Sequence, residues 1–305
     1  MQMAYLIVAH KNPKLLKLFI DALSSEQSAF FIHIDEKSDI RPFRIVTGEN
    51  VHFTNRRIPV YWGEFSMVEA ILTLLEQALA APKVYDRFIL LTGSDYPLRS
   101  KDYIHNFFEK NRLFEYMSMV KMPNKGKPLS RITVYRVPSD QPVVQLLVKV
   151  LAKLGLAKRD YRRHLGGLEP YAGSTSWALT RDACRYILDY IRTNPSLCRF
   201  FKNTAVSDEI LFPTILGNSL FAAHIKRNLL FDDWGKQSSH PEMINEKHVQ
   251  GFKSAENVVF SDMYGAGEML FARKFSDENL EIIAQVDDMI RQKDHPLVVS
   301  PKEKE

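Results

Sequence analysis

The residues best suited to chemistry lie in two distant segments of this 305-residue chain. The first is Ser207-Asp208-Glu209, which opens an apolar run that continues to Leu216. We predict that Glu209 is a catalytic base, because the helix dipole stabilises a carboxylate in a first turn and the carboxylate can accept a proton from a hydroxyl. A carboxylate that only caps the helix is the alternative interpretation.

The second segment is Phe271-Ala272-Arg273-Lys274-Phe275, which places two adjacent cations between apolar residues. Arginine offers bidentate hydrogen bonds and lysine a compact charge, and together they suit a diphosphate. A solvated surface pair is the alternative.

The chain has no Asp-x-Asp triplet, which many nucleotide-sugar enzymes use to hold a divalent metal. Its adjacent acidic pairs, Asp232-Asp233 and Asp287-Asp288, would point apart in an extended segment. Neither Gly-x-x-x-x-Gly-Lys nor Gly-x-Gly-x-x-Gly occurs. We therefore expect no metal and no cofactor, and side-chain cations that meet the charge of a leaving group.

Apolar, β-rich strands alternate with helical patterns in the N-terminal half, which predicts a Rossmann-type βαβ sheet. Predicted strands are 5–9, 30–34, 51–53 and 87–91, and predicted helices are 13–23 and 66–80. Further along, we expect strands at 171–179 and 228–234 and helices at 181–191, 210–216 and 278–290.

Polar residues follow three of these strands, where ligands of such sheets bind. His10, Asp35 and Asp95 all occupy strand ends. Asp35 is positioned to accept hydrogen bonds from a ribose or a base, although a loop carboxylate is often only a turn former. Asp95 lies in a glycine-containing turn for which structural and functional interpretations are balanced.

Trp62-Gly63-Glu64-Phe65-Ser66 precedes the helix predicted at 66–80. We predict that Ser66 caps this helix in a capping box with Glu69 and that the helix N-terminus favours an anion. A plain helix start with a packed Trp62 is the alternative.

The segment 143–163 combines an apolar helical pattern with several cations, among them Lys149, Lys153, Lys158 and Arg162. Such a segment can lie on an anionic membrane surface. The alternative is a helix packed on the domain with a solvated basic edge.

The formal charge of +5 and the pI of about 9.0 favour an anionic partner. Nucleic acid is disfavoured, because the cations are scattered and no known nucleic-acid module appears. Cys184 and Cys198 are too few for a disulfide framework and are expected to be packed thiols. We expect neither a signal peptide nor a membrane span, and hence a cytoplasmic protein with a peripheral contact to the inner face of the cell membrane.

Taken in order, six motifs resemble the core-2/I-branching N-acetylglucosaminyltransferase family, which includes peptide O-xylosyltransferases. They are His33-Ile34-Asp35-Glu36-Lys37-Ser38, Trp62-Gly63-Glu64-Phe65-Ser66, Leu91-Thr92-Gly93-Ser94-Asp95-Tyr96-Pro97-Leu98, Gly173-Ser174-Thr175-Ser176-Trp177, Ser207-Asp208-Glu209 and Phe271-Ala272-Arg273-Lys274-Phe275. The resemblance runs from about Tyr5 to Phe275.

The resemblance implies a GT-A-like mixed sheet flanked by helices in a single large domain, a UDP-sugar donor, inversion and no metal. By position, Glu209 matches the catalytic base, Arg273 and Lys274 the diphosphate-binding cations and Asp35 the uridine contact. We expect His10, at a strand end, and Ser66, at a helix start, to complete the nucleotide-sugar site. The sugar and acceptor pocket comprises Trp62, Asp95, Gly173, Ser174 and Trp234. Residues 1–120 are expected to form the nucleotide-binding half, 121–170 an insertion, 171–295 the acceptor and catalytic half, and 296–305 a flexible tail.

This chain lacks the anchor, stem and cysteine set of the family's animal members, which predicts a bacterial-type enzyme. We expect transfer of N-acetylglucosamine or xylose to a glycan or lipid-linked acceptor in surface polysaccharide assembly. Rival interpretations are a non-catalytic nucleotide- or glycan-binding protein on the same fold and a metal-dependent glycosyltransferase of another family, the latter disfavoured by the missing Asp-x-Asp.

Overall fold

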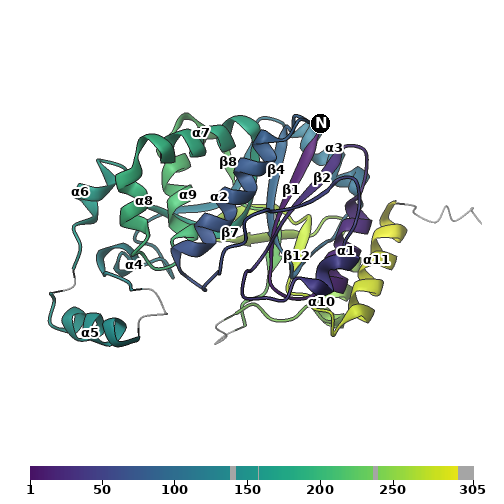
Figure 1. Ribbon diagram of the computed structural model, residues 1–305. Helices are drawn as coiled ribbons and strands as arrows, with labels where there is room; N and C mark the ends of the chain where they lie inside the picture. Colours follow the sequence, from purple (N-terminus) through teal and green to yellow (C-terminus); the bar gives the residue numbers. More distant parts are fainter. Residues whose placement is uncertain (138–141, 157, 236–239, 295–305) are drawn as a thin grey trace, which may run out of the picture.

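The computed structural model describes residues 1–137, 142–156, 158–235 and 240–294, and shows a mixed sheet with helices on both faces (Figure 1). Within these residues the larger sheet has seven strands, in the spatial order β3 (Val51–Phe53), β2 (Ser28–Ile34), β1 (Met3–Ala9), β4 (Arg87–Thr92), β7 (Tyr171–Thr180), β6 (Glu115–Lys121) and β8 (Ile225–Lys226). The first four are parallel, whereas β7 runs antiparallel to both of its neighbours. The predicted α/β class is confirmed.

Burial on both faces explains why the central strands are continuously apolar. In β1, Tyr5 and Ile7 point to one face, and Leu6 and Val8 to the other. The first face packs on α1 (Pro13–Leu23), α3 (Lys101–Lys110), α10 (Glu246–Ser254) and α11 (Leu280–Asp294). The second packs on α2 (Phe65–Ala80), α7 (Arg181–Thr193), α8 (Pro195–Phe201) and α9 (Asp208–Gly217).

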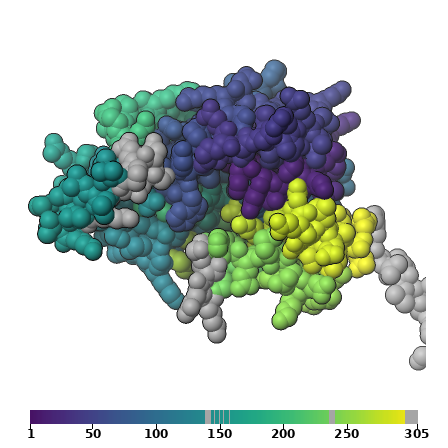
Figure 2. Space-filling view, turned by 60° about the horizontal axis from the view of Figure 1, so that its bottom comes forward, coloured from purple at the N-terminus to yellow at the C-terminus, as the bar shows by residue number. Residues whose placement is uncertain are grey.

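Distant parts of the chain meet in this core. Strand β4, from the first predicted half, pairs with β7, from the second. The purple N-terminal part and the yellow C-terminal part lie against each other in Figure 2. Residues of α1 and α11 belong to the same hydrophobic core. Both halves of the chain therefore share one sheet and its cores.

A smaller sheet carries most of the predicted chemistry. Strand β12 (Phe271–Arg273) lies between β5 (Asp95–Pro97), to which it is antiparallel, and β9 (Leu230–Asp232), to which it is parallel. This register places Arg273 opposite both Asp95 and Asp232. A separate hairpin of β10 (Val259–Asp262) and β11 (Gly265–Glu268) precedes β12.

The remaining helices are short or peripheral. They are α4 (Ser130–Thr133), α5 (Pro142–Lys153), α6 (Tyr161–Leu165) and the 3₁₀ turns η1 (Arg41–Ile45) and η2 (Leu220–His224). In the part of the chain that the structure describes, no helix combines the length and apolarity needed to cross a bilayer. The tail predicted at 296–305 lies outside the described residues.

The predicted capping box at Ser66 is wrong. Helix α2 begins one residue earlier, at Phe65, with Glu64 at the N-cap and no side-chain cap. The Ser66 hydroxyl instead accepts a hydrogen bond from the Tyr61 backbone amide at 2.9 Å, because the preceding loop folds back over the first turn. The left-handed φ of +70° at Gly63 permits this tight entry.

Candidate active site

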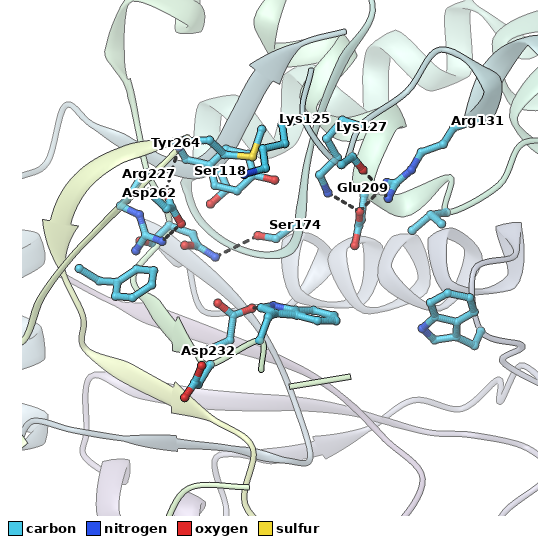
Figure 3. Close-up of a pocket in the computed structure, with 18 residues that line it drawn as sticks. Ser118, Lys125, Lys127, Arg131, Ser174, Glu209, Arg227, Asp232, Asp262 and Tyr264 are labelled. Atoms are coloured by element: carbon cyan, nitrogen blue, oxygen red, sulfur yellow. Dashed lines mark hydrogen bonds and ion pairs between the residues drawn. The ribbon is translucent and has the colours of Figure 1, made fainter. Parts of the chain in front are cut away.

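A cavity of about 630 Å³ opens beside the smaller sheet (Figure 3). Its walls come from the loop before α2, the loop after β6, the start of α9, strand β9 and the β10–β11 hairpin. Four of the predicted site residues line it: Trp62, Ser174, Glu209 and Trp234. The two tryptophans are 78% and 55% exposed, so their ring faces are available for stacking on a sugar.

Glu209 lies in the first turn of α9 and is partly exposed to the cavity. Its Oε2 accepts from Lys127 Nζ at 2.6 Å and from Arg131 Nη1 at 2.9 Å. Among the described residues, Oε1 has no hydrogen-bond partner. The carboxylate is therefore held by one oxygen, and the other is left for a ligand.

The backbone before α9 explains how Glu209 meets Trp62 in one cavity. Val206 adopts a left-handed φ of +52°, and its amide donates to the Gly63 carbonyl at 2.8 Å. This hydrogen bond joins the loop that carries Trp62 to the turn that starts α9.

Asp208 is the buried neighbour of Glu209. Its Oδ2 accepts from the Thr175 hydroxyl at 2.6 Å. Burial, together with the negative charge of Glu209, raises the pKa of Asp208 to about 6, although the Thr175 and backbone hydrogen bonds oppose the shift. Two adjacent carboxyl groups thus differ in environment, one buried and one facing the cavity.

The opposite wall of the cavity is a polar network (Figure 3). Arg227 pairs with Asp262 at 2.6 Å, and Asn228 donates to the Ser174 hydroxyl at 3.0 Å. Asp232 accepts from the Trp234 indole at 2.8 Å. Burial raises the pKa of Asp232 against the opposing effects of the Trp234 hydrogen bond and of nearby arginines.

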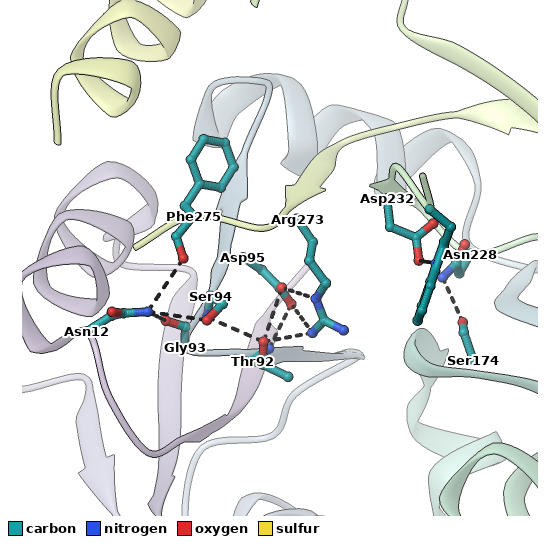
Figure 4. Close-up of polar contacts among 11 residues, drawn as sticks. Asn12, Thr92, Gly93, Ser94, Asp95, Ser174, Asn228, Asp232, Arg273 and Phe275 are labelled. Carbon is teal, nitrogen blue, oxygen red and sulfur yellow. Dashed lines mark hydrogen bonds and ion pairs between the residues drawn. The ribbon is translucent and has the colours of Figure 1, made fainter. Parts of the chain in front are cut away.

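Arg273 is held by Asp95, as Figure 4 shows. Its Nε donates to Asp95 Oδ1 at 2.7 Å, and Nη2 donates to Thr92 Oγ1 at 2.7 Å and to Asp95 Oδ2 at 3.2 Å. Burial disfavours the charged guanidinium, but Asp95, Asp232 and Glu209 outweigh it and raise the pKa of Arg273. Asp95 is fully buried, so its carboxylate orients Arg273 instead of lining the cavity.

Lys274, His10 and Asp35 form a second group, in which Lys274 and Asp35 both act electrostatically on His10. His10 follows β1, and burial and the nearby Lys11 lower its pKa, with Asp35 acting in the opposite direction. Burial, Lys11 and Arg273 lower the pKa of Lys274. Asp35 Oδ1 accepts from the Lys37 amide at 3.0 Å, so part of this carboxylate also shapes its own turn.

Seven predicted residues are not among those that line the main cavity: Asp35, Arg273, Lys274, His10, Ser66, Asp95 and Gly173. Ser66 lines a separate hollow of about 200 Å³ with Glu69 and Lys202. Gly173 lies behind the cavity wall, where a Cβ would stand only 1.7 Å from the Ser118 carbonyl oxygen. Glycine is thus needed here for close strand packing, and its carbonyl accepts from Lys127 Nζ.

Sequence reasoning missed the cations that hold Glu209. Lys127 and Arg131 lie in the basic, proline-containing stretch after β6, within the segment 121–170 that the sequence predicts only as an insertion. It also missed Asp262 and Tyr264 on the β10–β11 hairpin. The described residues contain no group of three or more His, Cys, Asp or Glu placed to hold a metal ion.

Comparison with known proteins agrees with this reading of the fold and motifs. The family model described as Core-2/I-Branching enzyme matches residues 3–257. Human xylosyltransferase 2 is 26% identical over 246 residues, covering 77% of this chain and 27% of that protein. Xylosyltransferase oxt of Drosophila pseudoobscura pseudoobscura is 21% identical over 226 residues, covering 72% and 24%.

The chain thus spans about a quarter to a third of the length of the curated relatives it matches. Among solved structures, the apo form of mouse xyloside xylosyltransferase 1 aligns with 88% of this chain and 97% of its own, at 12% identity and a TM-score of 0.35. The resemblance inferred from the six motifs is confirmed by the family match. The chain belongs to the Core-2/I-Branching enzyme family, which is a family of glycosyltransferases.

Proposed function

We propose that this chain is an inverting glycosyltransferase with a GT-A-like fold that moves a sugar from a UDP-sugar to an acceptor hydroxyl without a metal. The proposal is supported most directly by one arrangement. The cavity that holds Glu209 is bordered by Asp232, and Asp232 is paired in register with Arg273. This arrangement supports the proposal that a base for the acceptor and a cation for the leaving group act at neighbouring positions.

In this mechanism, the acceptor hydroxyl donates its proton to Glu209 Oε1 as its oxygen attacks the anomeric carbon. Lys127 and Arg131 hold the other carboxylate oxygen and fix the orientation of the base. The attack comes from the face opposite UDP, so one displacement inverts the anomeric centre without a covalent intermediate.

The leaving group is proposed to be UDP, with Arg273 and Lys274 at its diphosphate. Negative charge grows on the β-phosphate as the glycosidic bond breaks, and cations fixed in advance stabilise it best. Asp95 and Thr92 fix Arg273 in this way. Asp35 and Lys274 both act electrostatically on His10, and Asp35 and His10 are proposed to contact the uridine portion.

N-acetylglucosamine and xylose are the proposed donor sugars, and the names of the relatives make UDP-xylose the first donor to test. Trp62 and Trp234 are proposed to stack on the sugars, with Ser174 beside them. We propose that the acceptor is a glycan or lipid-linked hydroxyl in bacterial surface polysaccharide assembly. Residues 1–120 and 171–295 would supply the donor and acceptor halves.

The test is release of UDP from a panel of UDP-, GDP- and ADP-sugars in excess EDTA. Release from one UDP-sugar supports the proposal and identifies the donor. Release that requires added Mn²⁺ contradicts the metal-independent part. If no nucleotide is released, calorimetry with UDP discriminates: binding without turnover, even when glycan and lipid-linked acceptors are supplied, favours the alternative of a non-catalytic nucleotide-binding protein.

A further inference from the structure

Helix α5 exposes apolar side chains that the rest of the fold does not cover. On α5, Val143 is 80% exposed and Leu146 65%; in the turn directly after the helix, Leu154 is 67% exposed and Leu156 71%. The helix lies at one end of the molecule, away from the main sheet (Figure 1). None of its described residues belongs to either hydrophobic core. The sequence-based alternative of a helix packed on the domain therefore does not describe α5.

The exposed residues form a continuous face. Val143, Leu147, Val150 and Leu154 follow one another at intervals of four, three and four residues, which aligns them along one side of a helix. All four are exposed. A monomeric soluble protein rarely leaves such a contiguous apolar surface uncovered, and surfaces of this kind mark interaction sites.

The chain that returns from α5 is firmly attached to the domain. Lys158 forms an isolated antiparallel β-bridge with Val134, and the Arg159 amide donates to the Thr133 carbonyl at 2.7 Å. The Arg159 guanidinium donates to the Asn203 carbonyl at 2.6 Å and lies over the Phe200 ring. The segment that directly follows α5 is therefore held on the domain by several contacts.

Exposed cations lie on this helix and in the segment that follows it. Lys153 is on α5, and Lys158, Arg162 and Arg163 come after it; all four are exposed, and Asp160 is the one acidic residue among the described positions from 142 to 163. Asp160 caps α6, with its side chain accepting from the Arg163 amide. An exposed apolar helix in a segment with an excess of cations complements the headgroup region of an anionic bilayer.

We propose that α5 and the basic residues 158–163 dock this protein peripherally on an anionic lipid membrane. The twelve residues of α5 span about 18 Å, against the roughly 30 Å of a bilayer core, so the helix lies in the interface and does not cross it. Its apolar face enters the acyl boundary, and the cations contact lipid phosphates. This inference is independent of the reaction proposed above.

The test is flotation of the full-length protein with vesicles of phosphatidylcholine alone or with about one-third phosphatidylglycerol. The wild-type protein is expected to float with the anionic vesicles and to be released by high salt. A variant with Val143, Leu147, Val150 and Leu154 changed to serine is expected to bind at least about tenfold more weakly. Because these side chains are exposed, its melting temperature should be unchanged.

A matched control changes Leu113 and Leu220 to serine, since these leucines are 77% and 95% exposed elsewhere on the molecule. This control is expected to float like the wild type. The proposal is overturned if the wild type does not float with anionic vesicles or if both variants behave alike. It is also overturned if α5 instead joins two copies, seen as a dimer in gel filtration that the α5 variant abolishes while flotation is unchanged.

Discussion

Replacing Asp208 with asparagine should stabilise the protein at neutral pH, although Asp208 is a hydrogen-bonded residue next to the proposed base. Its carboxylate is buried, and its pKa is raised from 3.8 to about 6. A carboxyl group whose pKa is raised in the folded state destabilises the fold at every pH at which the group is ionised in the unfolded state. The reason is that the folded protein must either bind a proton or ionise the buried group at a cost in free energy. Stability is therefore lost as the pH rises from about 4 to about 6.

The size of the effect follows from the pKa difference. The difference between a pKa of 3.8 and a pKa of about 6, at 1.36 kcal/mol per pKa unit, corresponds to a loss of about 3 kcal/mol in the free energy of unfolding at pH 8. At pH 4.5 the same difference costs only about 1 kcal/mol, because the folded group is then almost fully protonated. Asparagine removes this cost and can still donate from its amide nitrogen to Thr175 Oγ1, which lies 2.6 Å from Asp208 Oδ2.

The assay is urea unfolding of both proteins at pH 4.5 and pH 8. The advantage of Asp208→Asn in the free energy of unfolding is expected to grow by about 2 kcal/mol between these two pH values. Asp182→Asn is the matched control, since Asp182 is an exposed carboxylate in the first turn of α7. Its removal should destabilise slightly, by about 0.3–1 kcal/mol, through the helix dipole.

An advantage of Asp208→Asn that is the same at both pH values would contradict this prediction. It would mean that the asparagine changes packing or hydrogen bonding and that ionisation of Asp208 is not costly in the fold.

Three further predictions concern other parts of the site. Arg273→Ala should weaken UDP binding about tenfold or more, and it should also destabilise the fold because Asp95 stays buried without its cation. Lys274→Met should weaken UDP binding without destabilising the fold. Calorimetry and urea unfolding separate the two, and unchanged UDP affinity in both variants would contradict the diphosphate role. Trp62→Ala should raise the acceptor KM several-fold in steady-state assays, with stability changed by less than about 0.5 kcal/mol, since the side chain is 78% exposed; an unchanged KM would exclude stacking. Gly173→Ala should destabilise by about 3 kcal/mol or more in thermal melts, because its Cβ would meet the backbone of Ser118 at 1.7 Å; wild-type melting would mean that the strands can separate freely.

Elements with a strong local pattern could be predicted from the sequence. Helix α1 and strand β3 have the predicted bounds, and the other early strands differ by one to two residues at an end. Continuous burial of β1 and β2 produces the apolar runs from which they were predicted. The start of α2 was missed by one residue, because a serine near a helix start can bond either the helix or the loop before it.

Long-range partners could not be predicted, because no local pattern encodes them. The ion pair of Asp95 and Arg273 joins residues 178 positions apart, through a strand register that emerges only in the fold. Likewise, the contact of Lys127 with Glu209 depends on how the loop after β6 folds over α9. The exposure of α5 was also left open, since its amphipathic pattern suits a packed helix and a membrane-bound helix equally.

The most direct test of the central claim compares UDP release by the wild type and by Glu209→Gln, using the donor found in EDTA and an acceptor. Glutamine keeps the shape of the side chain and can still accept from Lys127 and Arg131, but it cannot take the acceptor proton. The transfer rate of Glu209→Gln is expected to be about 10²–10⁴-fold lower, with UDP affinity unchanged by calorimetry. Transfer at a rate near that of the wild type would exclude Glu209 as the base.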